Sequence, residues 1–195
     1  MNPLENLNKY QVLLASASPR RRELLSQLCI EFDIAPTIEI DESFPQSLAA
    51  IDVAPHLSQL KANAYKKLIS TNQLIITADT VVINNDKILG KPASKQQAIE
   101  MLENLSGKTH NVITGVTITT ATRQSTFSAN TEVEFSTINK NEIRWYVEKF
   151  MPLDKAGAYG IQEWIGCIGV KNINGSYYNV MGLPLHKLYN ELKSF

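Results

Sequence analysis

Residues 13–25 read LLASASPRRRELL, a short apolar strand followed by a small-residue turn and a helical pattern. Ser18 is a favourable N-cap, and Pro19 stands at the first helical position, where proline is tolerated. Leucines then recur at helical spacing and give the helix one apolar face. The stretch therefore predicts a strand–turn–helix unit near the N-terminus.

Three consecutive arginines, Arg20 to Arg22, occupy the first turn of this predicted helix. A helix N-terminus carries partial positive charge, so arginine is unfavourable there. A bound anion, phosphate above all, would relieve the conflict, because N–H groups, helix dipole and guanidinium groups would all point at it. The alternative is a solvated basic turn with Glu23 as its partner. The segment alone favours neither hypothesis.

The composition is that of an ordinary globular protein, with 44% hydrophobic and 19% charged residues in a chain of 195. This length allows one sizeable core, or two small lobes that share a cleft. The 19 basic residues balance the 19 acidic ones. The balance argues against general binding to nucleic acid or to a membrane surface, since both need a basic excess.

Targeting signals are not evident in the sequence. Residues 1–11 lack the cationic start and apolar core of a signal peptide. No apolar run approaches the ~20 residues that a membrane span needs. Cys29 and Cys167 show neither paired nor metal-type spacing, and we expect them to be reduced, buried thiols. A soluble, cytoplasmic protein is therefore predicted.

Helical and strand patterns alternate along the rest of the chain. Helices are expected over residues 53–69, 94–107 and 139–150, and after Pro184. Strands are expected over residues 31–40, 74–78, 81–83 and within 109–138, with a turn at 84–86 and a hairpin over 168–180 that turns at Asn174-Gly175. This alternation predicts an α/β fold with a largely mixed sheet.

Asp79 lies inside the run LIITADTVVI, residues 74–83, which is otherwise nearly all apolar or β-branched. A buried carboxylate without partners is costly, so it must be paired, hydrogen-bonded or bound to a cation. A turn aspartate that accepts backbone N–H bonds is the alternative. We favour a functional role, because strand ends commonly carry active sites. Asp41 and Glu42 form a second acidic site in the sequence. Alone, this pair predicts a solvated loop; together with Asp79, it would supply oxygen ligands to a hard cation such as Mg²⁺.

Two lysines add positive charge to this set. Lys61 falls inside a helical pattern, where an exposed helix lysine is the simpler interpretation. Lys91 stands between Gly90 and Pro92 in a loop without a Walker sequence. Together with the arginines and the carboxylates, these lysines are typical of a metal-assisted phosphate site. The residues thus predict a hydrolase or a binder of a phosphorylated small molecule.

Short motifs follow one another over nearly the whole chain. They are ASASPRR (15–21), LSQLKA (57–62), ADTVV (78–82), GKP (90–92), LSG (105–107), DKAGAYGIQ (154–162), NGSY (174–177) and VMGLP (180–184). In this order they resemble the Maf family of nucleoside triphosphate pyrophosphatases. The resemblance implies one Maf-like domain over residues 1–195. It also implies an α/β fold like that of inosine triphosphate pyrophosphatases, with a mixed sheet, helices and two lobes around a deep cleft.

The resemblance also implies a house-cleaning activity, the hydrolysis of a nucleoside triphosphate to the monophosphate and pyrophosphate. It implies a divalent metal cation, Mg²⁺ or Mn²⁺, and members often form a homodimer. The form DKAGAYGIQ is similar to that of the branch acting on dTTP, UTP and modified pyrimidine nucleotides. A related branch that prefers 7-methyl-GTP has a different pattern in that loop.

The resemblance also implies roles for individual residues of this chain that match positions of the family motifs. Asp79 matches the proposed proton acceptor and metal-site aspartate. The polar residues at the phosphate end match Ser16, Arg20, Arg21, Lys61 and Lys91. Positions linked to substrate choice match Arg20, Thr80 and Gln162. One acidic residue of the pair Asp41 and Glu42 matches a further metal-site carboxylate, and the resemblance leaves open which of the two it is.

The chain departs from the family pattern after Gln162, where small residues usually follow. Here the sequence continues Glu163-Trp164-Ile165-Gly166-Cys167, and a bulky Trp164 beside the base-selecting loop would alter the shape of the pocket. Two other functions stay open. One is a nucleotide-binding regulator of septum formation and cell division, to which members of the family have been tied. The other is a pyrophosphatase with another base preference, such as 7-methyl-GTP.

Overall fold

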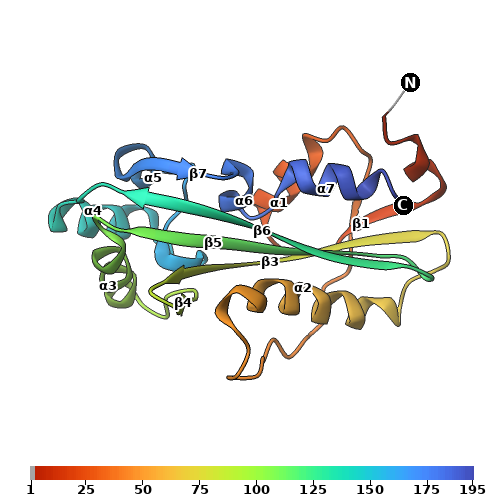
Figure 1. Ribbon diagram of the computed structural model, residues 1–195, viewed down its shortest axis with the longest axis horizontal. Coiled ribbons are helices and arrows are strands. Elements are labelled where there is room, and N and C mark those ends of the chain that lie inside the picture. The colour runs from red at the N-terminus through yellow and green to blue at the C-terminus, as the bar shows by residue number, and fades with distance from the viewer. Residues whose placement is uncertain (1–2) are drawn as a thin grey trace. The chain divides into compact units, whose positions relative to one another are not determined.

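The computed structural model describes residues 3–195 (Figure 1). The chain divides into two compact units. The first unit comprises the chain up to Asp79 together with residues 114–129 and 182–195. The second comprises residues 80–113 and 130–181. Strands β3 (Gln73–Asn84), β5 (Thr109–Thr119) and β6 (Gln124–Phe135) contribute residues to both units.

The sheet is mixed, as predicted, with strand order β2-β1-β3-β5-β6-β7 and β4 paired to β3. Strand β1 is parallel to β2 and β3, whereas the pairs β3–β4 and β6–β7 are antiparallel. The remaining elements, in chain order, are η1 (Glu5–Lys9), β1 (Gln11–Leu14), α1 (Pro19–Ser26), β2 (Asp33–Ile34), α2 (Ala50–Lys66), β4 (Lys87–Leu89), α3 (Lys95–Leu105), α4 (Lys140–Phe150), η2 (Ala156–Ala158), α5 (Trp164–Gly169), β7 (Val170–Asn174), α6 (Tyr177–Met181) and α7 (Leu185–Leu192).

In the first unit, α2 runs along one face of the strands, and α1 and α7 lie on the other (Figure 1). Strand β1 sits in parallel register between its neighbours, with Leu14 opposite Ile76 of β3 and Ile34 of β2. Helix α2 approaches β5 very closely at Gly115, where an added Cβ would lie 2.3 Å from the backbone nitrogen of Pro55. Only glycine permits that approach, and it fixes the position of α2 on the strands.

The second unit has its own apolar core. Helices α3 and α4 pack over it, and its buried members include Leu102, Phe135, Tyr146 and Ile165. The turn predicted at residues 84–86 is confirmed, because the two turn residues Asn85 and Asp86 have φ angles of 48° and 60° and β4 follows at once. Such left-handed angles at both central positions suit a tight two-residue hairpin.

Helix boundaries predicted from capping residues are confirmed. Ser18 caps α1 by accepting a hydrogen bond from the Arg21 N–H, and Pro19 is its first helical residue. Helix α4 opens with the predicted capping box, in which Asn139 and Glu142 satisfy each other's backbone donors. The final predicted helix begins after Pro184 as α7.

Three local predictions are wrong. The strand expected over residues 31–40 is reduced to β2, because only two of its residues pair with β1 and Pro36 has no N–H to extend the ladder. The helix predicted over residues 53–69 is α2, which ends at Lys66, and Leu68 beyond its end is 66% exposed. Cys29 and Cys167 are free thiols as expected, but both are exposed rather than buried.

The hairpin predicted over residues 168–180 is also wrong. Its first half is divided between α5 and β7, and β7 pairs with β6 instead of with the residues that follow it. Its second half is helix α6, where the Ser176 hydroxyl accepts a hydrogen bond from the Asn179 N–H. Gly175 has a φ of 137°, far from the angle of a type I′ turn, so the Asn-Gly pair links a strand to a helix.

Helices long and apolar enough to cross a membrane are absent from residues 3–195.

Candidate active site

Asp79, in the middle of β3, is paired with Lys61 of α2. The Lys61 ammonium lies 2.6 Å from Asp79 Oδ1 and 3.1 Å from Glu42 Oε2. The Lys61 and Asp79 side chains are only 15% and 16% exposed, whereas that of Glu42 is 52% exposed. The partner that a buried carboxylate requires is therefore an ammonium, and this ammonium joins two carboxylates from different parts of the chain.

Arg21 is anchored to main-chain carbonyls beside this cluster. Its guanidinium donates to the carbonyl oxygens of Ala78 and Gly182, both at 2.8 Å. Burial lowers the pKa of Arg21, while the negative charges of Asp79 and Glu42 act in the opposite direction. Arg21 thus ties α1 to the residue immediately before Asp79.

The start of α1 brings more predicted residues to the same unit. The Ser16 hydroxyl accepts a hydrogen bond from the Ser18 N–H at 3.2 Å and lies 3.5 Å from Arg21 Nη1. Arg20 is half-buried, and its positive charge adds to the lowering of the Arg21 pKa. The first unit therefore gathers hydroxyl, guanidinium, ammonium and carboxylate groups near Asp79, which lies in the middle of β3.

Of the two neighbouring acidic residues, the structure joins Glu42 to Lys61. Asp41 is exposed, and its carboxylate accepts the Ser43 N–H at 3.0 Å. Clusters of three or more His, Cys, Asp or Glu side chains suited to a metal are absent from residues 3–195. Two carboxylates nevertheless fit Mg²⁺ or Mn²⁺, because such ions commonly take one or two protein carboxylates and complete their shell with water and substrate phosphate oxygens.

Three further predicted residues belong to the second unit. Thr80 follows Asp79 directly in β3 and is half-buried. Lys91 is exposed in the loop after β4, where the preceding Gly90 carbonyl accepts a hydrogen bond from the Gly157 N–H at 3.1 Å. Gln162 is exposed in the turn before α5.

A polar cluster that sequence reasoning missed surrounds the Gln162 turn. Lys155, only 8% exposed, places its ammonium 3.0 Å from Glu163 Oε1 and 2.7 Å from Asp154 Oδ1. The Tyr146 hydroxyl donates to Glu163 Oε2 and accepts the Gly160 N–H at 3.3 Å. The departure at Glu163 was the available signal, because a new charge beside a buried segment needs a partner.

Trp164, the other bulky residue of that departure, packs on α4. Its ring centroid lies 4.7 Å from that of Trp145, with the ring planes inclined at 62°. Trp145 also contacts the Phe150 ring, with 6.0 Å between centroids. The Trp164 ring is thus engaged in an aromatic cluster on α4.

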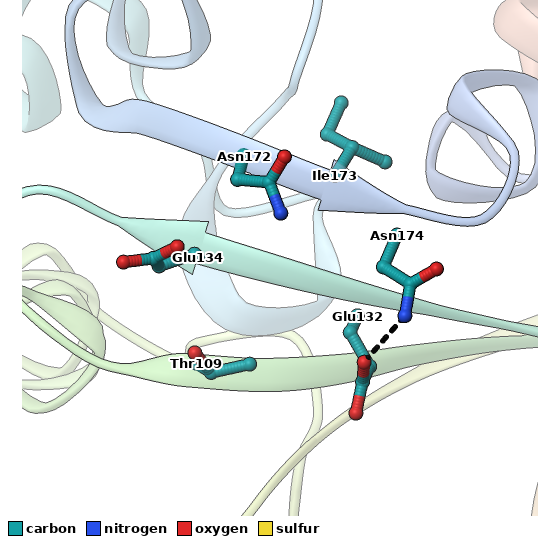
Figure 2. Close-up of a pocket in the computed structure, with 6 residues that line it drawn as sticks. All are labelled: Thr109, Glu132, Glu134, Asn172, Ile173 and Asn174. Atoms are coloured by element: carbon teal, nitrogen blue, oxygen red, sulfur yellow. Dashed lines mark hydrogen bonds between the residues drawn. The ribbon is translucent and has the colours of Figure 1, made fainter.

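A separate pocket of about 410 Å³ lies beside β6 and β7 (Figure 2). Its walls are Thr109, Glu132, Glu134, Asn172, Ile173 and Asn174. The Asn174 amide donates to Glu132 at 2.9 Å, and Lys171 pairs with Glu134 at 2.6 Å. Two carboxylates and no cationic side chain among the lining residues make this pocket a poor host for a triphosphate.

Comparison with a solved structure identifies the fold. The Ham1 protein of Staphylococcus aureus superimposes with a TM-score of 0.53 at 15% identity, covering 95% of this chain and 97% of that one. The chain is therefore an α/β protein of the Ham1 fold, as the sequence predicts. Residues 11–195 match the family model described as Maf-like protein, and the chain belongs to that family.

Two relatives of high sequence identity share one name. A dTTP/UTP pyrophosphatase of Bacteroides thetaiotaomicron is 52% identical over 190 residues, which cover 97% of this chain and 98% of the relative. A dTTP/UTP pyrophosphatase of Parabacteroides distasonis is 51% identical over 192 residues, covering 98% of this chain and all of the relative.

Proposed function

We propose that this chain is a nucleoside triphosphate pyrophosphatase that converts dTTP and UTP to the monophosphate and pyrophosphate. The name of the relatives supports the substrate class. The structural observation that carries the proposal is the joining of Asp79 and Glu42 by the Lys61 ammonium. Adjacent positive and negative groups suit a metal-bound triphosphate, because the positive groups can bind phosphate oxygens and the carboxylates can bind the cation.

The reaction adds water to the α-phosphorus and breaks the bond to the β-phosphate oxygen. Asp79 accepts the proton of the attacking water, and pyrophosphate leaves. Asp79 and Glu42 would hold a divalent cation, which would supply positive charge to polarise the phosphate oxygens. Glu42 is proposed over Asp41 because it is the carboxylate that contacts Lys61, whereas Asp41 is bonded to its own loop.

The phosphate groups are proposed to bind at the start of α1 and at the two lysines. The proposed phosphate ligands are Ser16, Arg20, Arg21, Lys61 and Lys91. Their positive charges neutralise the triphosphate and the charge that grows on the leaving pyrophosphate. The α1 N-terminus adds its dipole to this attraction.

Base selection is proposed for Arg20, Thr80 and Gln162. A glutamine amide carries both a donor and an acceptor, so it can pair with the edge of a uracil or thymine ring. Modified pyrimidine nucleotides with an unaltered pairing edge would be accepted in the same way. We further propose that residues 1–195 act as one functional domain, as a homodimer in the cytoplasm; the family match extends through both units.

The test is pyrophosphate release from dTTP, UTP, CTP, GTP and 7-methyl-GTP, each with Mg²⁺, Mn²⁺ or EDTA. Preference for dTTP and UTP that disappears in EDTA supports the proposal. Preference for 7-methyl-GTP would agree with the proposed pyrophosphatase reaction but would overturn the proposed preference for dTTP and UTP. Nucleotide binding without turnover on any substrate would favour a regulator of septum formation or cell division instead.

A further inference from the structure

Residues 160–163 form a β-turn that carries Gln162. The Glu163 N–H donates to the Gly160 carbonyl at 2.9 Å, which closes the four-residue turn with Ile161 and Gln162 in its centre. Ile161 is 6% exposed, whereas the Gln162 side chain is exposed. The turn therefore has one buried and one exposed central residue.

Both ends of this turn are bonded to one hydroxyl group. Tyr146 of α4 accepts the Gly160 N–H and donates to the Glu163 carboxylate. Burial, followed by the hydrogen bond to Glu163 and the negative charge of that residue, raises the pKa of Tyr146, so the phenol keeps the proton that it donates. The Tyr146 ring is fully buried and stacks on Phe150, with 5.2 Å between centroids. This packing holds the position of the Tyr146 hydroxyl.

The second oxygen of Glu163 is held by Lys155, at 3.0 Å. Glu163 is the N-cap residue of α5, yet its side chain makes no capping bond and turns back over Gly160 instead. An added Cβ at Gly160 would lie 2.8 Å from the Glu163 side chain. The turn is thus closed by its backbone, by Tyr146 and by the Lys155–Glu163 ion pair, all within the second unit.

We infer that Tyr146, Glu163 and Lys155, together called the clamp, are positioning residues that fix the Gly160–Glu163 turn and thereby set the orientation of Gln162 toward the base. The inference rests on the proposed function, because it is there that Gln162 selects the base. The physical reason is that an exposed glutamine side chain has several rotatable bonds. A rigid backbone at Gln162 reduces the number of orientations that its amide group can adopt.

The first experiment compares UTP with CTP, which differ at the pairing edge of the base. The variants are Tyr146→Phe and Glu163→Gln, with Tyr178→Phe and Glu148→Gln as matched exposed controls. We expect Tyr146→Phe to lower the ratio of kcat/KM for UTP to kcat/KM for CTP by about tenfold, with CTP turnover unchanged. Glu163→Gln keeps a hydrogen-bond acceptor for Tyr146 and should lower the ratio less.

A double-variant cycle separates positioning from general structural damage. If the clamp acts through Gln162, Tyr146→Phe has no further effect on the UTP/CTP ratio once Gln162→Ala is present. Equal losses on UTP and CTP, or full additivity with Gln162→Ala, would overturn the inference. Thermal denaturation of each variant identifies unfolding, and Glu163→Gln supplies the test should Tyr146→Phe be poorly folded.

Failure of the proposed function has a different signature. A wild-type chain that releases no pyrophosphate from any nucleotide overturns that function, and the inference with it. A wild-type chain that prefers UTP, with a Gln162→Ala variant that loses this preference and a Tyr146→Phe variant that keeps it, overturns the clamp alone. Unchanged preference in Gln162→Ala also overturns the clamp, while pyrophosphate release stands.

Discussion

Lys61 and Asp79 form a close ion pair, 2.6 Å between Nζ and Oδ1, although they are 18 positions apart in the sequence. One residue comes from α2 and the other from β3. Both side chains are largely shielded from solvent. The pair is therefore made by the packing of helix on strand.

The Asp79→Asn variant should lose turnover and keep triphosphate binding. Asparagine preserves the size of the side chain but can neither accept the proton of water nor carry the charge that a cation needs. We expect kcat to fall by about 10²–10⁴-fold. Pyrophosphate release measures the first effect and calorimetry with a non-hydrolysable triphosphate the second. Asp86→Asn, in the β3–β4 turn, is the matched control; full activity in Asp79→Asn would remove this residue from the mechanism.

The Lys61→Met variant should bind Mg²⁺ with a larger stabilising effect than the wild type does. Methionine fills a similar space but leaves Asp79 and Glu42 without their shared ammonium. Loss of that ammonium should lower the free energy of unfolding by about 1–3 kcal/mol. Thermal denaturation without nucleotide, with and without Mg²⁺, measures both effects, and Lys67→Met is the control. Identical Mg²⁺ shifts in variant and wild type would argue against a cation site at these carboxylates.

The Arg21→Lys variant should be less stable and less active, despite keeping its charge. A single ammonium cannot reproduce the geometry with which the guanidinium bonds the carbonyls of Ala78 and Gly182. We expect a loss of about 1–3 kcal/mol in the free energy of unfolding. Chemical denaturation and kcat/KM for UTP are the measurements. Arg22→Lys, exposed on the same helix, is the control, and equal stability of the two variants would contradict the anchoring role.

His110 should make stability depend on pH. Burial lowers its pKa from 6.5 to about 4, and its Nε2 lies 2.7 Å from the Tyr159 hydroxyl. The unfolded chain binds a proton to this residue below its ordinary pKa, whereas the folded chain does so only near pH 4. The His110 contribution is therefore present above pH 6.5 and is lost as the pH falls from about 6.5 to about 4, by up to about 3 kcal/mol.

The His110→Gln variant isolates this effect. Glutamine can still pair with Tyr159 but does not titrate. We expect the difference in free energy of unfolding between wild type and variant to shrink as the pH is lowered from 7 to 4. Denaturation with urea at a series of pH values measures it. Parallel curves for the two proteins would show that His110 does not carry the pH dependence.

Local signals in the sequence predicted the local parts of this fold. Ser18 and Pro19 fixed the start of α1, and Asn139 with Glu142 fixed the start of α4, because capping depends on residues at most a few positions apart. The segment 168–180 could not be predicted in the same way. Its Asn-Gly pair is a hairpin signal by itself, and pairing of β7 with the distant β6 overrides that signal.

In the candidate site, too, local signals predicted some features, whereas others depended on the three-dimensional packing. The need of Asp79 for a partner followed from its apolar neighbours, but the identity of that partner depended on how α2 crosses the sheet. The bonds from Tyr146 to Glu163, and from Lys155 to Glu163, join residues whose spacing matches no local pattern. Motif resemblance supplied Gln162, while the groups that hold its turn became visible only in three dimensions.

Gly115 has a consequence for attempts to stabilise this protein. Replacing glycine by alanine is a common route to stability, because it restrains the unfolded chain. At this position the extra carbon would lie 2.3–2.4 Å from the α2 backbone, and the helix would have to move away from β5. The helix carries Lys61, so a methyl group added to a strand would move the ammonium that Asp79 and Glu42 share. The charge arrangement of the site thus depends on a position that has no side chain at all.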